Sequence, residues 1–392
     1  MSELQTTGDH ALSQAVDGRP GVPGVVAVAT DRHGNIYEGV AGHRAQGIDS
    51  PMTLDTVFAI YSATKPITAT AVLQLVETGQ LDLDAPAKDY IPALGTVQVL
   101  DGYDNAGTAR LRAPTRDITL RMLLTHTAGF GYDFCNAHYR KLGELSGRAR
   151  LTDGPETLLT PLLFDPGERW EYGANIEWAG LIVEAITGQR LGTYLREHVL
   201  DPLGMADTGF SLTGTMGERL ATVHQRGTDG ALIPAHRTEL PKPPAWDRGG
   251  GGMYSTALDY ARFMRMWLGD GSGVLRPETV RMAAQNAMGD LKVVMLPGVM
   301  THLSNDAEFF PGMPKSWGLS FMINDEPAPT GRAAGSLAWA GLANVYFWID
   351  RMTGIAGFWA TQVLPFVDPA SIDGFYAFET AIYRTMARQT AA

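Results

Sequence analysis

A serine followed three residues later by a lysine is the most reactive combination in this 392-residue chain. Ser62 follows the apolar segment 58–61, and Lys65 precedes an amphipathic pattern that runs to Gly79, as expected of a helix buried along one side. Because residues i and i+3 share a helical face, the Lys65 ammonium could reach the Ser62 hydroxyl. A serine attacks poorly until a neighbouring base takes its proton, and a buried lysine with a lowered pKa can be that base. The pair therefore predicts an activated nucleophile at the start of a helix.

The same spacing also has an interpretation without chemistry. Serine often caps a helix, and a lysine in the first turn is often solvated. Two observations favour the reactive interpretation: Lys65 stands directly before the apolar helix rather than on a charged face, and no other lysine has a serine three residues before it. The choice depends on whether the rest of the chain supplies the other groups that a serine nucleophile needs.

Two further stretches could supply a proton donor and N–H groups for an oxyanion. A turn at Pro166 and Gly167 places Tyr172 on a rigid bend, where its phenol could point into a cleft; a solvated tyrosine is the alternative. At residues 339–342 a strand becomes glycine-rich, and Gly341 would allow a ligand to approach the backbone; a simple β-bulge is the alternative.

The composition describes an acidic globular protein. Hydrophobic residues make up 45% and charged residues 19%, which excludes a disordered or membrane-spanning chain. The net charge of −11, without any basic block, opposes nucleic-acid binding. The first ten residues lack a basic region followed by an apolar core, and the single cysteine, Cys135, is typical of the reducing cytoplasm. We therefore expect a cytoplasmic protein without nucleic-acid or membrane partners.

Hydrophobic patterns predict the elements that would position the reactive groups. Residues 24–30 and 36–42, joined by turn residues 31–35, predict an antiparallel hairpin after a helix near residues 12–16. An amphipathic helix over residues 372–386 closes the chain. Before it, β-branched and aromatic runs separated by turns predict a meander of strands over residues 317–323, 336–340, 344–350 and 355–362.

The middle of the chain has a different character. From about residue 85 to 246 we expect helices and long Pro- and Gly-rich connections, with few strands. Residues 118–127 and 178–187 predict two of these helices. The polar, proline-rich segment 214–246 predicts an exposed loop beside a site.

Together these elements predict an α+β protein, an α/β sandwich with a mainly antiparallel sheet flanked by helices. Residues 1–84 and 250–392 would form a discontinuous sheet domain, and residues 85–249 an inserted, mainly helical domain with active-site loops. Ser62, Tyr172 and the late glycine-rich strand come from different parts of this arrangement. We therefore expect them to meet at the cleft between the two domains.

The three reactive stretches resemble the three motifs of the serine β-lactamase and penicillin-binding-protein superfamily. Residues 62–65 stand at the first motif, Tyr172 at the tyrosine of the second, and residues 339–341 at the third. The resemblance covers almost the whole chain, is closest to the class C β-lactamase-like esterases called family VIII carboxylesterases, and implies a β-lactamase/transpeptidase-like fold. Similar stretches between the motifs are residues 123–129, 202–205 and 249–255.

Two departures from the β-lactamase pattern bear on the substrate. The third motif there begins with a lysine whose charge meets the carboxylate of the antibiotic, whereas this chain has the neutral Trp339. The second motif there reads Tyr-x-Asn, but Ala174 occupies the asparagine position and Asn175 falls one residue late. Loss of both groups removes the main reasons for recognising a β-lactam. The sequence therefore favours an esterase.

By this resemblance, Ser62 attacks the ester carbonyl and forms an acyl-enzyme, while Lys65 and Tyr172 share the proton transfer. The sequence leaves open which of the two is the resting base. The backbone N–H groups of Ser62 and Leu342 would form the oxyanion hole. Water, or an acceptor alcohol, would then release the acyl group.

The resemblance also suggests binding residues. Tyr132 matches a site-lining tyrosine of similar esterases, and Glu177 lies where they carry an acid that steadies the tyrosine loop. Aromatic side chains are more often core than site, so we expect only part of the candidate aromatic set to line a pocket. The predicted substrate-binding residues are Tyr132, Phe134, Trp339, Ala340, Gly341 and Trp348, and further aromatic candidates are Phe130, Trp170 and Trp246.

Other reactive residues are expected to play no direct part. His126 is expected to be structural, and Cys135, without a Cys-His-Asn pattern, is expected to be buried or near the site. No histidine has metal-ligand spacing, so we expect neither a metal nor a cofactor, and the absence of Gly-x-Ser-x-Gly argues against an α/β-hydrolase.

We therefore expect a serine hydrolase that cleaves carboxylic esters of short to medium acyl chain length, with a small-molecule ester as its partner. An acyltransferase of the same fold would differ in preferring an alcohol or amine over water. A β-lactamase or D-amino-acid peptidase is expected to have a cationic third motif, which this chain lacks. A non-catalytic binding protein is expected to lack Ser62, Lys65 or Tyr172, all of which are present. The sequence leaves the oligomeric state open.

Overall fold

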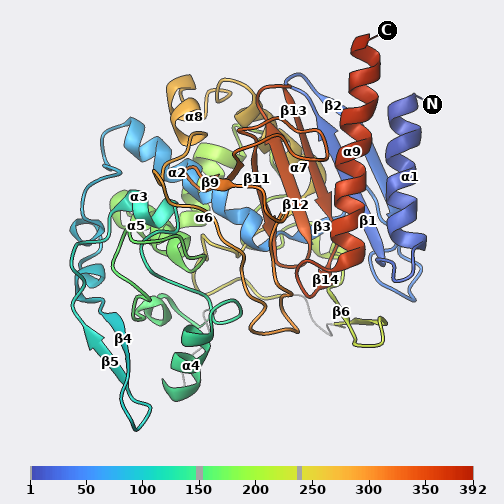
Figure 1. Cartoon of the computed structure of the whole chain (residues 1–392). Helices are drawn as coiled ribbons and strands as arrows, with labels where there is room; N and C mark the ends of the chain where they lie inside the picture. Colours follow the sequence, from blue (N-terminus) through green and yellow to red (C-terminus); the bar gives the residue numbers. More distant parts are fainter. Residues whose placement is uncertain (1, 147–152, 236–240, 392) are drawn as a thin grey trace.

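A seven-stranded antiparallel sheet forms the centre of the protein (Figure 1). The computed structural model describes residues 2–146, 153–235 and 241–391. The first two strands come from the start of the chain and the other five from its end, which confirms the predicted α+β class. In their order across the sheet, the strands are β2 (Asn35–Gly42), β1 (Gly24–Thr30), β13 (Ile355–Ala360), β12 (Val345–Asp350), β11 (Leu337–Gly341), β10 (Met322–Asn324) and β9 (Lys315–Trp317).

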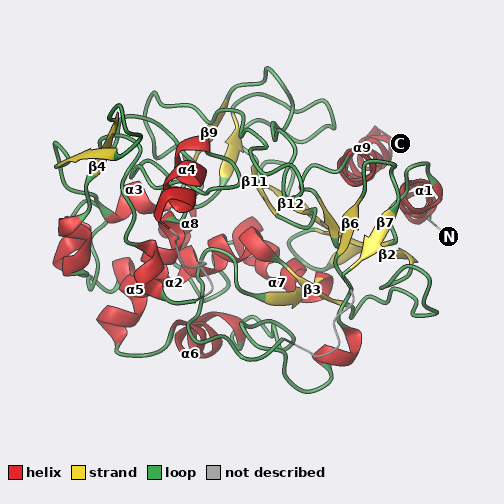
Figure 2. Cartoon of the chain, turned by 90° about the horizontal axis from the view of Figure 1, so that it is seen from below, coloured by secondary structure: helices red, strands yellow, loops and turns green. Residues whose placement is uncertain are grey.

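Helices cover both faces of the sheet, so β1, β12 and β13 are buried along their whole length. On one face, α1 (Glu3–Asp17) and α9 (Pro369–Ala391) lie side by side (Figures 1 and 2). On the other face, α7 (Ala257–Leu268) packs against β1 and β13. Strands buried on both faces read as continuous apolar runs, which is why they were recognisable in the sequence.

Side chains of β12 alternate between these two helical layers. The Trp348 ring packs against Phe375 of α9, with ring centroids 5.8 Å apart. The neighbouring Phe347 ring faces Tyr260 of α7, with centroids 5.2 Å apart. A bulky indole fits here because β13 has Gly357 beside it, where a Cβ atom would lie 2.0 Å from the Trp348 ring. Because successive side chains of a strand point to opposite faces of the sheet, each β12 residue packs against one of the two helical layers.

The predicted strand over residues 317–323 is wrong, because the chain reverses within it. Its residues form the end of β9 and the start of β10, joined by a turn in which the Gly318 N–H donates to the Phe321 carbonyl at 2.8 Å. Ser320 has a φ of 80°, which a continuous strand does not allow. Every residue of this turn is buried, so the apolar run hides the reversal.

The helices differ from the predicted ones mainly at their ends. The expected helix at 118–127 is the single turn α3 (Leu120–Leu124), which begins after the capping Thr119 side chain. The expected helix at 178–187 begins earlier, as α5 (Asn175–Thr187), and ends at Gly188 in the left-handed conformation. The remaining helices are α2 (Lys65–Glu77), α4 (Ala137–Ser146), α6 (Leu191–Leu195), α8 (Pro277–Ala283), a π-helical turn (Arg196–Leu200) and 3-10 turns at Tyr61–Thr64, Ala87–Asp89, Pro92–Thr96, Pro155–Leu158 and Met216–Arg219.

The middle of the chain contains more strands than the sequence predicts. β4 (Val99–Tyr103) and β5 (Ala109–Arg112) form a separate hairpin. Within the predicted loop 214–246, β6 (His224–Arg226) and β7 (Leu232–Pro234) pair with each other, and β6 also pairs with β14 (Val363–Leu364). Residues 236–240 of that loop lie outside the described residues.

The division into a sheet domain (1–84 and 250–392) and an inserted domain (85–249) stays a prediction. The short strands β3 (Val57–Ala59) and β8 (Tyr254–Thr256) pair with each other from the two sequence segments of the predicted sheet domain. In the part of the chain that the structure describes, no helix is both long and apolar enough to cross a membrane.

Candidate active site

Ser62 lies where β3 ends and a helix begins. It belongs to the 3-10 turn Tyr61–Thr64, which continues directly into α2, so Ser62 opens a 3-10 turn rather than the α-helix itself. Side chains at i and i+3 eclipse in a 3-10 helix. The Lys65 Nζ atom accordingly lies 3.1 Å from the Ser62 Oγ atom. Pro66 follows in the first turn of α2, where its missing N–H costs little.

Lys65 is completely buried, which is rare for a lysine without an ion pair. Besides Ser62, its Nζ atom contacts the Gly250 carbonyl at 2.6 Å and the Tyr132 hydroxyl at 3.3 Å. Burial lowers the pKa of Lys65 to about 7; the Glu177 carboxylate opposes this shift, and the Arg248 charge adds to it. At neutral pH a large fraction of Lys65 is therefore uncharged and able to accept a proton.

Two tyrosines complete the surroundings of Lys65. Its Nζ atom lies 4.8 Å from the ring centroid of Tyr172 and 5.3 Å from that of Tyr132. Burial raises the pKa of both phenols, and hydrogen bonds from Ser62 and Trp339 only partly offset this for Tyr172. Both phenols therefore keep their protons at neutral pH and can donate them.

The bend that carries Tyr172 is held from behind by buried polar and aromatic groups. The His126 ring lies 4.9 Å from the Tyr172 ring, and its Nδ1 atom is 2.9 Å from the Asn175 amide nitrogen. Burial lowers the pKa of His126 well below its usual range, so this histidine is neutral. A Cβ atom on Gly173 would lie 2.2 Å from the Phe130 carbonyl, so only glycine allows this approach. Asn175 thus supports the bend instead of facing a substrate.

The third stretch meets the Ser62 turn at the end of β11. A Cβ atom on Gly341 would lie 2.2 Å from the Ile60 carbonyl, so glycine is required for β11 to pack against the chain entering Ser62. One residue later, Leu342 lines the same space as Ser62. In β11, the Trp339 indole N–H donates to the Tyr172 hydroxyl at 3.2 Å. The structure thus brings the three reactive stretches together.

Two cavities meet at Ser62. The larger, of about 480 Å³, is lined by polar and charged side chains as well as apolar ones. The smaller, of about 20 Å³, has mostly apolar walls, with Ser304 among its polar lining residues. Ser62, Phe134 and Leu342 line both, so the serine hydroxyl lies at their junction. Lining the larger cavity are Tyr132, Arg140, Glu144, Glu177, Arg248 and Met300; lining the smaller are Cys135, Tyr172, Leu296, Trp339, Ala340 and Phe366.

Comparison with known proteins supplies the family. A family model described as Beta-lactamase matches residues 11–382, nearly the whole chain. The chain belongs to the Beta-lactamase family. It is 33% identical to monacolin J acid methylbutanoyltransferase of Aspergillus terreus, over 96% of this chain and 94% of that protein. It is 30% identical to lovastatin esterase of Penicillium rubens, over 93% of this chain and 94% of that protein.

A solved structure agrees with this assignment. The LovD6 mutant of simvastatin synthase from Aspergillus terreus superposes with a TM-score of 0.86 at 31% identity, covering 99% of this chain and 96% of that one. The likeness therefore extends through both the sheet and the helical region of this Beta-lactamase-family chain. The β-lactamase/transpeptidase-like fold, which the resemblance implied, is confirmed.

Most, but not all, of the predicted binding residues of this Beta-lactamase-family chain line the cavities. Tyr132, Phe134, Trp339, Ala340 and Gly341 do so. The prediction for Trp348 is wrong: its side chain is fully buried beneath α9, where the indole N–H donates to the Tyr383 hydroxyl at 3.1 Å. The further candidates Phe130, Trp170 and Trp246 are buried outside both linings.

The glycine-rich stretch 249–252 has a role that the sequence did not show. The Gly250 N–H donates to the Glu177 carboxylate at 2.9 Å, while the Gly250 carbonyl accepts from Lys65. Glu177 therefore holds this loop, and its expected part in steadying the tyrosine bend stays a prediction. Arg248 was missed altogether, because one arginine beside glycines has no periodic signal.

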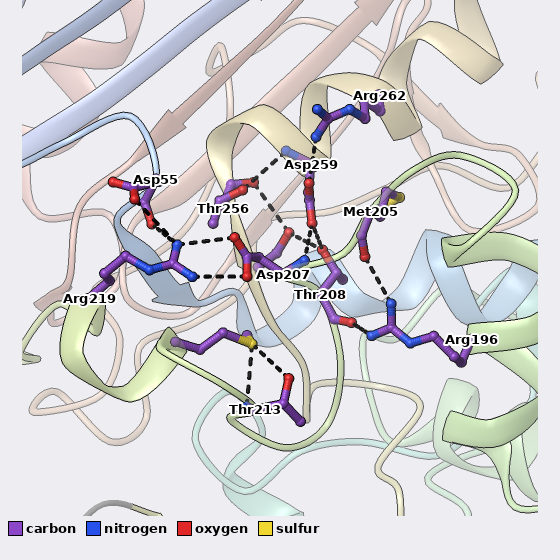
Figure 3. A network of polar contacts seen from close by, with 12 residues as sticks. Asp55, Arg196, Met205, Asp207, Thr208, Thr213, Arg219, Thr256, Asp259 and Arg262 are labelled. Atoms are coloured by element: carbon purple, nitrogen blue, oxygen red, sulfur yellow. Dashed lines mark hydrogen bonds and ion pairs between the residues drawn. The ribbon is translucent and has the colours of Figure 1, made fainter.

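A partly buried polar network supports the strand that leads to Ser62 (Figure 3). β3 pairs with β8, and Ser255 of β8 shares a 2.8 Å hydrogen bond with Thr208. Thr208 also donates to the Asp259 carboxylate at 2.9 Å, and Asp207 pairs with Arg219 at 2.9 Å. The Asp259 carboxylate is buried, so loss of its hydrogen bonds would be costly. The network therefore supports the backbone that positions Ser62.

Among the described residues, no three His, Cys, Asp or Glu side chains are grouped to hold a metal.

Proposed function

We propose that this chain is a serine carboxylesterase of the family VIII kind, with Ser62 as its nucleophile. The observation that carries the proposal is the fully buried Lys65, which lies 3.1 Å from the Ser62 Oγ atom and has a pKa of about 7. Such a lysine can accept the serine proton near neutral pH, as general-base catalysis requires. The contacts also favour Lys65, rather than Tyr172, as the resting base in this mechanism.

In the first step, the Ser62 hydroxyl proton passes to neutral Lys65 as the Oγ atom forms a bond with the ester carbonyl carbon. A neutral amine has two N–H donors, which the Gly250 carbonyl and the Tyr132 hydroxyl oxygen can accept, and a lone pair left for Ser62. The negative charge that develops on the carbonyl oxygen would be stabilised by the Ser62 and Leu342 backbone N–H groups.

In the second step, the bond to the leaving alcohol breaks and its oxygen takes a proton. Tyr172 is placed to give that proton, because its raised pKa keeps the phenol protonated at neutral pH and the phenol shares a hydrogen bond with Ser62. The Lys65 ammonium, 4.8 Å from the centroid of the Tyr172 ring, favours the phenolate that results. Water then attacks the acyl-enzyme and gives its proton to the phenolate. As the acyl bond breaks and releases the carboxylic acid, the Lys65 ammonium returns its proton to the Ser62 oxygen, from which it lies 3.1 Å away.

The two cavities suggest how an ester would lie. The small cavity beside Ser62 offers about 20 Å³, little more than the space of one water molecule, so short acyl chains need the least rearrangement of its lining. The larger cavity would hold the alcohol part, for which it has polar as well as apolar walls. This arrangement favours acyl groups at the short end of the predicted short-to-medium range.

Acyl transfer is the second candidate, and it has support of comparable weight. One relative is named a methylbutanoyltransferase, and another is named an esterase. The larger cavity could hold an acceptor alcohol where the leaving alcohol had been. Hydrolysis and transfer then differ only in which hydroxyl attacks the acyl-enzyme. β-Lactam hydrolysis has less support, because the neutral Trp339 indole is directed at Tyr172.

The test is a panel of p-nitrophenyl esters, from acetate to octanoate, measured beside a chromogenic cephalosporin. We expect acetate and butyrate to be the best substrates, and Ser62→Ala to abolish their turnover while Ser13→Ala, an exposed position on α1, retains it. Ester turnover that survives in Ser62→Ala would refute the nucleophile, and dominant cephalosporin turnover would refute the esterase.

The same panel separates hydrolysis from transfer. Adding a primary alcohol as acceptor and measuring the new ester against free acid gives the partition of the acyl-enzyme. Mostly acid at high acceptor concentration supports the esterase, and mostly new ester supports the acyltransferase. The cytoplasmic location and the small-molecule ester partner stay predictions.

A further inference from the structure

Arg248 is a charged side chain of the larger cavity that the proposed mechanism does not use. It is half-buried and lines the space that Ser62 also faces. Its charge acts on Lys65, Tyr132 and Glu177, which places the guanidinium near the reacting groups. Within residues 2–146, 153–235 and 241–391, the guanidinium has neither an ion pair nor a hydrogen bond.

The backbone that carries Arg248 is fixed on both sides. Before it, the Asp247 carboxylate is held by the Arg190 guanidinium at 2.8 Å and 2.9 Å. After it, the Thr68 hydroxyl donates to the Gly249 carbonyl at 2.7 Å. The Arg248 carbonyl itself accepts N–H groups from residues 251 and 252. A rigid loop thus presents an arginine head group without a partner among the described residues, which is the preorganisation that ligand binding favours.

The other charges of the larger cavity are accounted for differently. Arg140 is bound by the Glu144 carboxylate at 2.9 Å and by the Val299 carbonyl at 3.0 Å. Glu177 is buried and accepts the Gly250 N–H. Asp133 is exposed to water at the edge of the cavity. Within the described part of the chain, Arg248 therefore differs from these lining charges, since it is partly removed from water and left unpaired.

We propose that Arg248 binds a carboxylate on the alcohol part of the substrate, so that the preferred esters carry an acid group beyond the scissile bond. The inference rests on the proposed function, in which the alcohol part occupies the larger cavity. A guanidinium presents a planar fork of donors that matches a carboxylate, and such charge-assisted bonds are the stronger ones. The neutral Trp339 at the third motif offers no charge to an anion. Arg248 would bind the carboxylate from the larger cavity instead.

The test compares two aryl acetates whose para substituents differ mainly in charge, and it follows release of the phenol, so that cleavage of the methyl ester is not counted. The charged ester is para-acetoxybenzoate, which carries a carboxylate on its leaving phenol, and the neutral ester is methyl para-acetoxybenzoate, which carries a methyl ester in the same place. Each enzyme variant is compared with wild type on the same compound, so the intrinsic reactivities of the two compounds cancel. The variants are Arg248→Gln, Arg248→Lys and, as a matched control, Arg110→Gln, an exposed arginine of β5 that does not line the cavity.

We expect Arg248→Gln to raise KM for the charged ester by about ten- to a hundredfold, the range for losing a hydrogen-bonded charge. For the neutral ester, KM should change less than about twofold on the same reasoning. Arg248→Lys should recover part of the loss, and Arg110→Gln should affect neither compound. Equal changes in KM for both esters would overturn the inference, because Arg248 would then act through Lys65. An unchanged KM for both esters would overturn it as well.

The proposed function is tested separately with the neutral ester. If Ser62→Ala hydrolyses methyl para-acetoxybenzoate as fast as wild type, the nucleophile is wrong whatever Arg248 does. If Ser62→Ala is inactive while Arg248→Gln leaves the two esters in their wild-type ratio, the esterase stands and only the carboxylate contact fails.

Discussion

Replacing Lys65 by arginine tests the proposed base most directly. A guanidinium keeps a positive charge near Ser62 but is never neutral in a protein, so it cannot accept the serine proton. Both side chains are long and cationic, and the change therefore separates proton transfer from simple charge. Lys65 contacts Ser62, Tyr132 and Gly250 through one nitrogen atom, and arginine has donors for all three.

The structure gives the size of the effect. With a pKa of about 7, roughly half of Lys65 is neutral at pH 7. A solvated lysine, with a pKa near 10.4, would be neutral in only about one molecule in 2,500 at that pH. Burial thus raises the amount of usable base by about three orders of magnitude. We expect Lys65→Arg to lower kcat/KM by at least about 10³-fold, in the upper range for general-base catalysis.

The assay is kcat/KM for p-nitrophenyl acetate between pH 5 and 9. Because only neutral Lys65 accepts a proton, wild-type kcat/KM should rise about tenfold per pH unit at low pH and level off above about pH 7. Lys65→Arg should show no such limb below pH 9. A wild-type profile that is flat from pH 5 to 8, or a Lys65→Arg variant with more than about a tenth of wild-type activity, would refute Lys65 as the base.

Three further substitutions test the geometry around Ser62. Gly341→Ala would place its Cβ atom 2.2 Å from the Ile60 carbonyl, so we expect kcat for p-nitrophenyl acetate to fall about 10²-fold with KM little changed; an unchanged kcat would contradict the oxyanion role of this strand end. Leu296→Ala enlarges the small cavity, so the ratio of kcat/KM for hexanoate to that for acetate should rise about tenfold, and an unchanged ratio would place the acyl chain elsewhere. Trp348→Phe loses the indole hydrogen bond to Tyr383, so denaturant unfolding should show a loss of about 1–2 kcal/mol with kcat/KM within about twofold of wild type; a large loss of activity would restore Trp348 to the site.

The sheet could be predicted because its central strands are buried on both faces. Residues 24–30, 344–350 and 355–362 read as apolar, β-branched runs between turn residues, and each lies within one residue or two of a real strand. The reversal at Gly318 and Ser320 could not be read in the same way, since an apolar turn buried in the protein has no polar signal. The β4–β5 hairpin could not be predicted for the opposite reason, because Val99 is the only buried residue of its two strands.

The reactive groups were easier to predict than the walls around them. Ser62 and Lys65 are three residues apart, so helical geometry alone could place their side chains together. Whether the side chain of Trp348 or that of Phe347 faces a given helical layer depends on the register of β12 against β11 and β13. That register is set by pairing between neighbouring strands and cannot be read from β12 alone. The position of Arg248 in the cavity depends on the contacts of a glycine-rich loop with α2 and α5. These contacts join distant parts of the chain, so no single segment of the sequence predicts them.

The neutral side chain of Trp339 is compatible with an uncharged Lys65, which the proposed mechanism requires. A lysine there would place a second ammonium in the same buried cluster, where the two like charges would lower each other's pKa and compete for the same acceptors. Trp339 instead donates one N–H to the Tyr172 hydroxyl oxygen at 3.2 Å and adds no charge. That bond stabilises the phenolate, and so works against the burial that raises the pKa of Tyr172. The tryptophan thus makes Tyr172 a better proton donor while leaving Lys65 as the only titrating amine beside Ser62 among the described residues.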